Sequence, residues 1–274
     1  MYNGIWKEEE YMIKRRLKPK YRKILNILVL ILTLVFLGVA IYSIINIINW
    51  KKDVSDNDKI QDKIGDNIMI IKPIEEQKAK YDIDFKSLKE INKDTIAYVK
   101  VNNTNIDYVV VKGNDNDYYL NHNFEKKWNI AGWIFADYHN KFDESDKNLI
   151  IYGHNIKDGS MFGTLKNILN KDWYENEENH KVILVTEKGT YYYQVFSTYS
   201  RKPEDYYINT KFKNDVEFNE FIKTIKSRTI YDYGVDVSSE DKILTLSSCT
   251  DDGSKRVVLH AKLIENDELK ASED

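Results

Sequence analysis

The single cysteine of the chain, Cys249, ends a short run in which apolar and polar residues alternate, from Lys242 to Cys249. A lone cysteine forms no internal disulfide. If it lies outside the cell, as the membrane segment described below predicts, a free thiol calls for a chemical role. Arg256 follows seven residues later, at the start of a second apolar run that reaches Ile264. This arrangement predicts that Cys249 is a catalytic nucleophile.

A thiol nucleophile needs a base or ion-pair partner and a group that stabilises the oxyanion. His154 fits the first role, because it directly follows the apolar stretch 147–152 and a glycine that permits close approach of other segments. Arg256 fits the second, because facing ends of antiparallel strands lie about 5 Å apart and a guanidinium is always charged. The plainer alternatives are a loop-capping histidine, a surface arginine and a small buried cysteine.

The remaining histidines show weaker signals. His260 alternates with the apolar residues of the last strand and is expected at the surface. The other three lie in polar, loop-like surroundings: His122, His139 and His180.

The elements that position these residues are mostly short strands. The patterns predict strands at 95–101, 106–112, 147–152, 181–186 and 190–198, with two more flanking the 249–256 loop. Helical spacing occurs at 85–91, 160–169 and 216–228. We expect a mainly β fold, a small closed barrel of short, mostly antiparallel strands with peripheral helices.

An apolar segment precedes this domain. Residues 24–50 contain no charge, and the 19 residues from Ile27 to Ile45 are interrupted only by Thr33, Gly38 and Ser43. At about 1.5 Å per residue this stretch spans a hydrocarbon core of roughly 30 Å. A buried core helix and a cleaved signal peptide are the alternatives. The apolar run continues past the small residues at 38–40, which favours an uncleaved anchor.

The charge distribution gives an orientation and excludes one class of function. Residues 1–23 carry eight Lys or Arg and three Glu, and residues 51–274 carry the −8 that brings the net charge to −3. The positive-inside rule therefore predicts a cytoplasmic basic tail at 1–23, a transmembrane anchor at 24–50, a juxtamembrane stalk at 51–80 and an extracellular catalytic domain at 81–270. An acidic domain is a poor candidate for binding nucleic acid.

Three ordered segments resemble the sortases, the cysteine transpeptidases of Gram-positive cell surfaces, and class B sortases in particular. The stretch 245–249 (TLSSC), followed by Arg256, is similar to the family's TLxxC…R signature. The stretches 152–162 and 132–138 resemble the class B histidine block and the segment before it. The helix at 216–228 also fits class B. The resemblance covers roughly residues 81–265 and implies a sortase barrel.

The resemblance implies a role for each residue. Cys249 would attack a threonine carbonyl in the C-terminal sorting motif of a secreted protein, His154 would act as general acid and base, and Arg256 would stabilise the oxyanion. A peptidoglycan cross-bridge amine would then resolve the thioacyl intermediate. Three further residues would contact the substrate: Ser247, Asn116 and Leu120. No cofactor and no metal are implied.

Two rival functions remain at this stage. In papain-like endopeptidases the cysteine usually precedes the histidine and opens a helix, whereas here His154 comes first and Cys249 ends a strand. A membrane-anchored binding or scaffold protein would carry Cys249 as an inert buried residue.

Overall fold

The chain begins with a long helix. A computed structural model describes residues 19–71, 80–249 and 253–266, and the chain divides into two units after Lys52. Helix α2, Pro19–Gly65, contains the whole charge-free stretch and is long and apolar enough to cross a membrane. This agrees with the predicted N-terminal transmembrane helix. Most of the predicted basic tail lies outside the described residues.

The end of α2 belongs to the second unit, which begins at Asp53. The sequence predicts a stalk over 51–80 and a folded domain from Tyr81, and the structure differs on this point. Four α2 side chains, spaced three or four residues apart on one helix face, are buried: Val54, Asn57, Ile60 and Ile64. Because most residues of this stretch are polar, its composition alone does not reveal the buried face. Strand β1, Ile68–Ile71, then pairs with β2, Lys80–Ile83.

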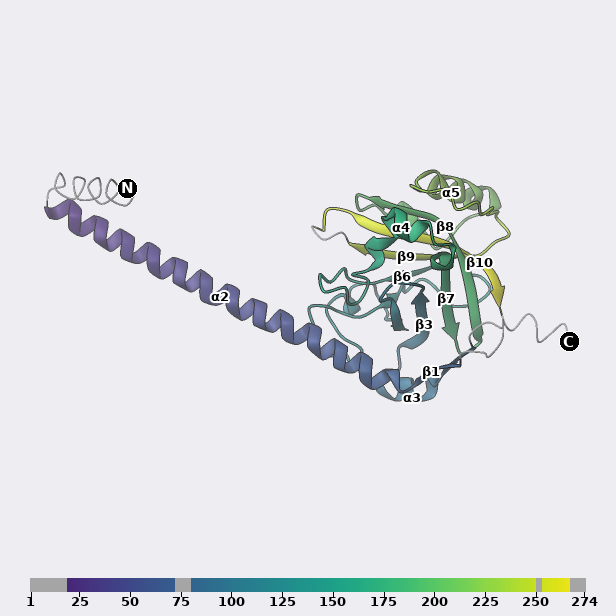
Figure 1. The fold of residues 1–274 in the computed structure, drawn as a ribbon, viewed down its shortest axis with the longest axis horizontal. Coiled ribbons are helices and arrows are strands. Elements are labelled where there is room, and N and C mark those ends of the chain that lie inside the picture. Colours follow the sequence, from purple (N-terminus) through teal and green to yellow (C-terminus); the bar gives the residue numbers. More distant parts are fainter. Residues whose placement is uncertain (1–18, 72–79, 250–252, 267–274) are drawn as a thin grey trace. The chain divides into compact units, whose positions relative to one another are not determined.

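Eight strands form a closed barrel in the order β10-β8-β7-β3-β4-β5-β6-β9 (Figure 1). Neighbouring strands are antiparallel except for the parallel pairs β4–β5 and β6–β9. This confirms the predicted closed barrel of mostly antiparallel strands. The strands are β3 Thr95–Val101, β4 Asp107–Val111, β5 Phe135–Ala136, β6 Asn148–Tyr152, β7 Lys181–Thr186, β8 Gly189–Arg201, β9 Ile243–Cys249 and β10 Arg256–Asn266.

Short helices connect and cover the strands. They are α3 Phe85–Ile91, η1 Tyr118–Leu120, η2 Leu165–Leu169, α4 Lys171–Tyr174, η3 Glu177–His180, η4 Tyr206–Ile208 and α5 Asp215–Ser227, where η marks a 3₁₀ helix. The helix predicted at 160–169 is only the 3₁₀ segment η2. Gly159 and Met161 have φ of +90° and +53°, and these left-handed conformations prevent an earlier helical start.

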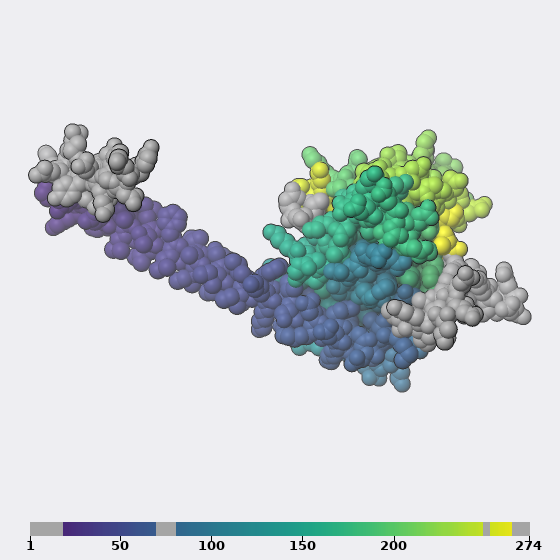
Figure 2. Space-filling model, in the orientation of Figure 1, coloured from purple at the N-terminus to yellow at the C-terminus, as the bar shows by residue number. Residues whose placement is uncertain are grey.

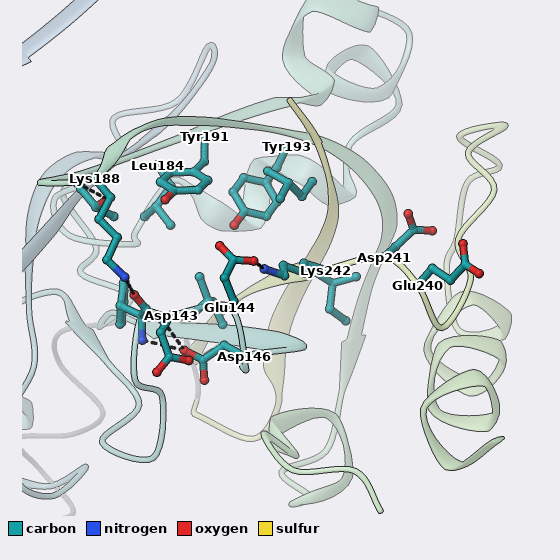
Figure 3. A pocket seen from close by; sticks show the side chains of 15 residues that line it. Asp143, Glu144, Asp146, Leu184, Lys188, Tyr191, Tyr193, Glu240, Asp241 and Lys242 are labelled. Carbon is teal, nitrogen blue, oxygen red and sulfur yellow. Dashed lines mark hydrogen bonds and ion pairs between the residues drawn. The ribbon is translucent and has the colours of Figure 1, made fainter. Parts of the chain in front are cut away.

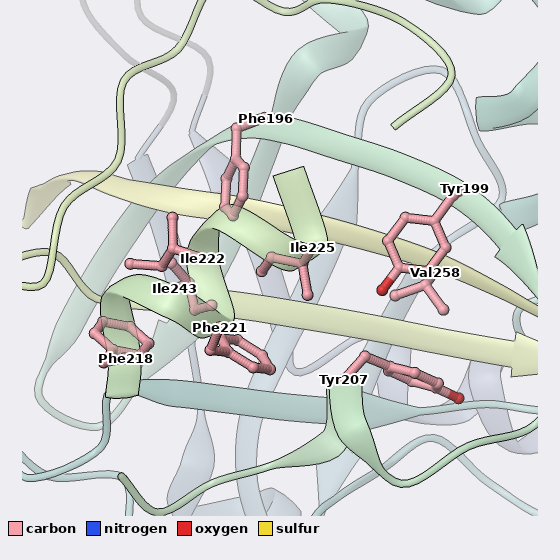
Figure 4. Packing of buried hydrophobic residues seen from close by; sticks show 9 residues of the cluster. All are labelled: Phe196, Tyr199, Tyr207, Phe218, Phe221, Ile222, Ile225, Ile243 and Val258. Atoms are coloured by element: carbon pink, nitrogen blue, oxygen red, sulfur yellow. The ribbon is translucent and has the colours of Figure 1, made fainter. Parts of the chain in front are cut away.

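Helix α5 packs on the outside of the barrel. Its N-cap residue is Asn214, whose side chain accepts a hydrogen bond from the Glu217 N–H. Figure 4 shows its apolar face against β8, β9 and β10, and Figure 2 shows α5 on the opposite side of the domain from β1 and α3. The buried cluster consists of Phe196, Tyr199, Tyr207, Phe218, Phe221, Ile222, Ile225, Ile243 and Val258. Because Tyr207 belongs to η4, this cluster also holds the segment before α5.

We expect the fragment 53–274 to be more stable than the fragment 81–274 by several kcal/mol, since burying one aliphatic side chain contributes about 1.5–3 kcal/mol. The shorter fragment loses Val54, Ile60 and Ile64 from the buried face of α2. Urea unfolding of the two fragments measures the difference. Equal unfolding free energies would show that this face adds nothing to the stability of the domain.

Candidate active site

The parallel pairing of β6 with β9 sets the position of His154 relative to Cys249. Tyr152 lies opposite Ser247 in this ladder, and the Gly153 N–H extends it by donating to the Ser247 carbonyl at 3.2 Å. His154 comes two residues after Tyr152, and Cys249 comes two residues after Ser247. Because adjacent strands lie about 4.8 Å apart, the two residues stand at equivalent levels of neighbouring strands. The structure describes the backbone of Cys249 but not its side chain.

The antiparallel pairing of β9 with β10 brings in Arg256. The two strand ends are in register, with Arg256 opposite Cys249, as expected from the sequence. Arg201 of β8 is the partner of Arg256 on the other side of β10. Cys249 thus has the His154 segment beside it on one strand and Arg256 on the other.

The imidazole of His154 is fixed by a backbone carbonyl. Its Nε2 lies 2.7 Å from the carbonyl oxygen of Leu120, in the 3₁₀ segment η1. A carbonyl oxygen only accepts, so Nε2 carries the proton of the neutral ring and Nδ1 carries the lone pair. The ring is therefore held in one tautomer, with Nδ1 as the basic atom.

A cavity of about 270 Å³ collects the predicted residues. Every predicted site residue whose side chain is described lines it: Asn116, Leu120, His154, Ser247 and Arg256. The remaining lining residues are Phe135, Tyr152, Gly153, Pro203, Glu204, Asp205, Tyr207, Ile208 and Ser248. Residues spread over 140 positions of the sequence thus share one cleft at the carboxyl ends of β6 and β9.

Comparison with known proteins identifies the family. The sortase domain family matches residues 99–264. Sortase B of Staphylococcus aureus is 38% identical over 184 residues, covering 66% of this chain and 74% of that protein. Sortase B of Listeria monocytogenes is 37% identical over 186 residues, with the same coverage. The crystal structure of sortase B from B. anthracis matches with a TM-score of 0.68 at 34% identity, covering 78% of this chain and 99% of that one.

The chain belongs to the sortase family. Its relatives place it among the class B enzymes, so it is a sortase B-type cysteine transpeptidase. This favours an enzyme over a binding protein with an inert cysteine.

Two of the predicted substrate-contacting residues of this sortase are held by the protein itself. Ser247 is buried, and its hydroxyl lies 3.1 Å from the hydroxyl of Tyr207. The Asn116 amide donates to Asp137 Oδ2 at 2.8 Å and accepts from the Tyr138 N–H at 3.0 Å. Both side chains therefore have defined orientations in the cleft wall.

Asp137 organises the cleft wall near Asn116. This carboxylate is buried, and its Oδ2 also accepts a hydrogen bond from the Tyr152 hydroxyl at 2.8 Å. Its Oδ1 accepts hydrogen bonds from the backbone N–H and from the ring Nδ1 of His139. Burial, followed by the Asp137 charge, raises the pKa of Tyr152 far above its usual value. Tyr152 is thus a neutral hydrogen-bond donor at the base of the cleft.

The sequence analysis missed the wall formed by residues 203–208. Glu204 lines the cleft and pairs with Arg201 at 2.9 Å and Arg228 at 2.5 Å. Tyr207 belongs to the same wall, and its ring is buried in the cluster under α5. No local pattern distinguishes this stretch from a surface loop. Its place in the cleft depends on the packing of η4 and α5.

His260 is not at the surface, and that prediction was wrong. It is fully buried between β8 and β9, in contact with Tyr199 and Thr245. The Thr245 hydroxyl donates to Asn148 Oδ1 at 2.7 Å, so it accepts from His260 Nδ1 at 2.8 Å. The Tyr199 hydroxyl then donates to Nε2 at 2.9 Å. Alternation along β10 failed as a guide because α5 covers this face of the barrel.

Figure 3 shows a second cavity, of about 340 Å³. It lies at the other ends of β6 and β9, because Leu149 and Ile243 line it. Both lysines that line it have partners within the protein: Lys242 pairs with Glu144, and Lys188 donates to the Phe142 carbonyl at 3.0 Å. None of the predicted site residues whose side chains are described lines this cavity. Within the described ranges, no group of three or more His, Cys, Asp or Glu side chains is arranged to hold a metal ion.

We expect His260 to make the stability of the protein dependent on pH. Burial, followed by the Arg228 charge, lowers the pKa of His260 from 6.5 to about 3. Between these values the unfolded chain binds a proton that the folded protein does not, so the unfolding free energy falls as the pH falls below 6.5. The contribution is complete above pH 6.5. From pH 7 to 5 the loss is roughly 2 kcal/mol.

Urea unfolding of the fragment 53–274 at pH 7 and pH 5, with and without His260→Gln, measures this term. Glutamine retains a donor and an acceptor but does not titrate. The change in unfolding free energy between the two pH values is compared in the two proteins. Their difference removes the contribution of the carboxylates, which both proteins share. Parallel pH dependence in both proteins would refute the assignment.

We also expect Gly153→Ala to destabilise the fold and disturb His154. An added Cβ would lie 2.5 Å from Ile134 Cδ1 and 2.6 Å from Phe162 Cγ, and both side chains are fully buried. Overpacking of this kind costs about 1–3 kcal/mol. Unfolding and peptide-cleavage assays measure the two effects. Gly65→Ala is the matched control, because no atom lies within 4 Å of its added Cβ, and a similar loss in that variant would contradict the explanation.

Proposed function

We propose that this sortase cleaves a C-terminal sorting motif after threonine and transfers the protein to a peptidoglycan amine. The Cys249 thiolate attacks the threonine carbonyl carbon, the C–N bond breaks, and protonated His154 gives its proton to the leaving amine. In the second half, the incoming amine attacks the thioester. His154 takes a proton from it, and the thiolate leaves. The two half-reactions restore the enzyme.

The observation that carries this proposal is the strand register. The β6–β9 and β9–β10 pairings set His154 and Arg256 beside the backbone of Cys249 from two different strands. A thiol, an imidazole and a guanidinium in that order supply the nucleophile, the acid–base group and the charge that acyl transfer requires. Cys249 ends β9 and Arg256 begins β10, whereas His154 follows the end of β6 by two residues.

The hydrogen bond of His154 identifies the atom that moves the proton. Since Nε2 is bound to the Leu120 carbonyl, Nδ1 is the position that exchanges protons with the thiol and the amines. Arg256 keeps its charge throughout the reaction and offers several donors to the oxyanion. Its guanidinium lines the same cleft as His154.

The cleft wall supplies the proposed contacts with the sorting motif. Leu120 is 39% exposed and offers an apolar surface, whereas Ser247 and Asn116 present polar groups whose orientations are already fixed. Such preorganised groups bind a peptide with little loss of side-chain freedom. The partners proposed here are secreted proteins with a C-terminal sorting signal and an amine of the cross-bridge peptide.

We place the catalytic unit outside the cell. Seven basic residues lie between Lys14 and Lys23, before the apolar stretch, and only Lys51 and Lys52 follow it before the acidic residues begin. The positive-inside rule then gives a cytoplasmic N-terminus and a single membrane crossing within α2. In this orientation the thiol faces the compartment that contains the peptidoglycan.

Peptide cleavage by the fragment 53–274 tests the mechanism, using fluorophore–quencher peptides with NPxTx-like and PPxTG-like motifs. We expect cleavage after threonine and a thioacyl adduct on Cys249 by mass spectrometry. Cys249→Ala should abolish cleavage, and His154→Ala and Arg256→Ala should each lower kcat/KM by about 100-fold or more.

Lys255→Ala is the control for Arg256→Ala, because it removes a neighbouring exposed positive charge. It should retain nearly full activity. A thiol that resists alkylation in the folded protein, together with activity that survives Cys249→Ala, would exclude the nucleophile assignment.

A further inference from the structure

The C-terminal part of α2 contacts residues 129–132. These residues lie next to Leu120, whose carbonyl accepts the hydrogen bond from His154. Asn57 is 1% exposed, and its Nδ2 donates to the Gly132 carbonyl at 2.9 Å. Asp53 adds two bonds one turn earlier. Its carbonyl accepts from Asn129 Nδ2 at 2.7 Å, and its Oδ2 accepts from the Ile130 N–H at 3.0 Å. Helix α2 therefore holds residues 129–132 through three hydrogen bonds.

Gly132 in turn packs directly against the backbone of η1. Its φ is +57°, and an added Cβ would lie 2.4 Å from the Tyr119 carbonyl oxygen and 2.7 Å from that of Leu120. The next residue, Trp133, donates its N–H to the Tyr119 carbonyl at 3.0 Å. The position of the Leu120 carbonyl thus depends on where residues 129–133 lie.

These contacts form a continuous path from α2 to His154. Asn57 holds Gly132, Gly132 lies against the Leu120 carbonyl, and that carbonyl accepts from His154 Nε2. We propose that Asn57 and Asp53 are positioning residues that keep the Leu120 carbonyl where it selects the Nε2–H tautomer of His154. This inference rests on the proposed role of His154.

The chemical reason is the distinction between the two ring nitrogens. If the Leu120 carbonyl moves away, Nε2 loses its acceptor and the Nδ1–H tautomer becomes populated. The lone pair then points away from the reacting atoms, and only part of the enzyme is competent. Ser247 and Asn116, the polar groups proposed to contact the sorting motif, are not part of this path, so the loss falls on kcat more than on KM. Displacements of about 1 Å near reacting groups cost up to 100-fold in rate.

The test uses the full chain in detergent micelles, with Asn57→Leu and the matched control Gln61→Leu. Gln61 lies one turn further along α2, and its Nε2 donates at 2.7 Å to the carbonyl of Asp107, which belongs to β4 and not to residues 129–133 or η1. Each variant removes one amide donor from α2 to a backbone carbonyl. We expect both to lower Tm, and only Asn57→Leu to lower kcat, by about tenfold or more and by a larger factor than it changes KM.

Long-range ¹⁵N–¹H spectra of histidine-labelled protein supply a readout that a purely structural role would not move. The His154 signals should show the Nε2–H tautomer in the parent and in Gln61→Leu, and a mixture in Asn57→Leu. If Asn57→Leu does not fold, Asp53→Ala takes its place. Asp53→Asn then serves as the rescue variant, because it retains an acceptor for the Ile130 N–H.

Equal kcat values in Asn57→Leu and Gln61→Leu, or an unchanged tautomer signal, would overturn the inference. His154→Ala separates this failure from a failure of the proposed function. An active His154→Ala protein would refute the role of His154 itself. An inactive His154→Ala protein beside a fully active Asn57→Leu protein would refute only the role of α2.

Discussion

The parallel pairing of β6 with β9 is the interaction on which the site depends. These strands are far apart in sequence, and their register alone determines that His154 and Cys249 end at the same level. Gly153 makes the pairing possible, since its N–H continues the ladder while Ile134 and Phe162 occupy the space of a side chain. A slip of one residue would turn every side chain of β9 to the opposite face. The buried Leu246 and Ser247 oppose such a slip, because each side chain has its own buried environment.

Three of the polar side chains in the cleft are already hydrogen-bonded within the protein. His154 contacts a carbonyl, Ser247 contacts Tyr207, and Asn116 contacts both Asp137 and the backbone of Tyr138. An environment of fixed dipoles stabilises developing charge better than one that must reorganise during the reaction. The cost is that the cleft depends on distant packing. Tyr207 is oriented by the cluster beneath α5, and the Leu120 carbonyl by residues 129–133.

The sequence predicts the features of this protein that are local in the chain. The strand that ends at Cys249, the strand that begins at Arg256 and the apolar stretch before His154 each carry their own pattern, so the barrel class and the choice of Cys249, His154 and Arg256 follow from them. Asn116, Leu120 and Ser247, which also line the cleft, are predicted only from the family resemblance. The burial of His260 does not follow, because α5 comes from another part of the chain and covers an alternating strand. The wall at 203–208 has the same origin. Its residues reach the cleft only after η4 and α5 have packed.

The end of α2 shows how composition and pattern can disagree. Lysine and aspartate dominate residues 51–66 and suggest a solvated stalk, yet Val54, Ile60 and Ile64 recur at helical spacing around Asn57. A buried asparagine in such a stripe is stable only when a partner compensates for its desolvation. Here the partner is the carbonyl of Gly132, a group that no sequence pattern places near residue 57. A polar residue within an otherwise apolar helical face is therefore best interpreted as half of a hydrogen bond. Its other half must be sought in a loop, where backbone carbonyls remain free to accept.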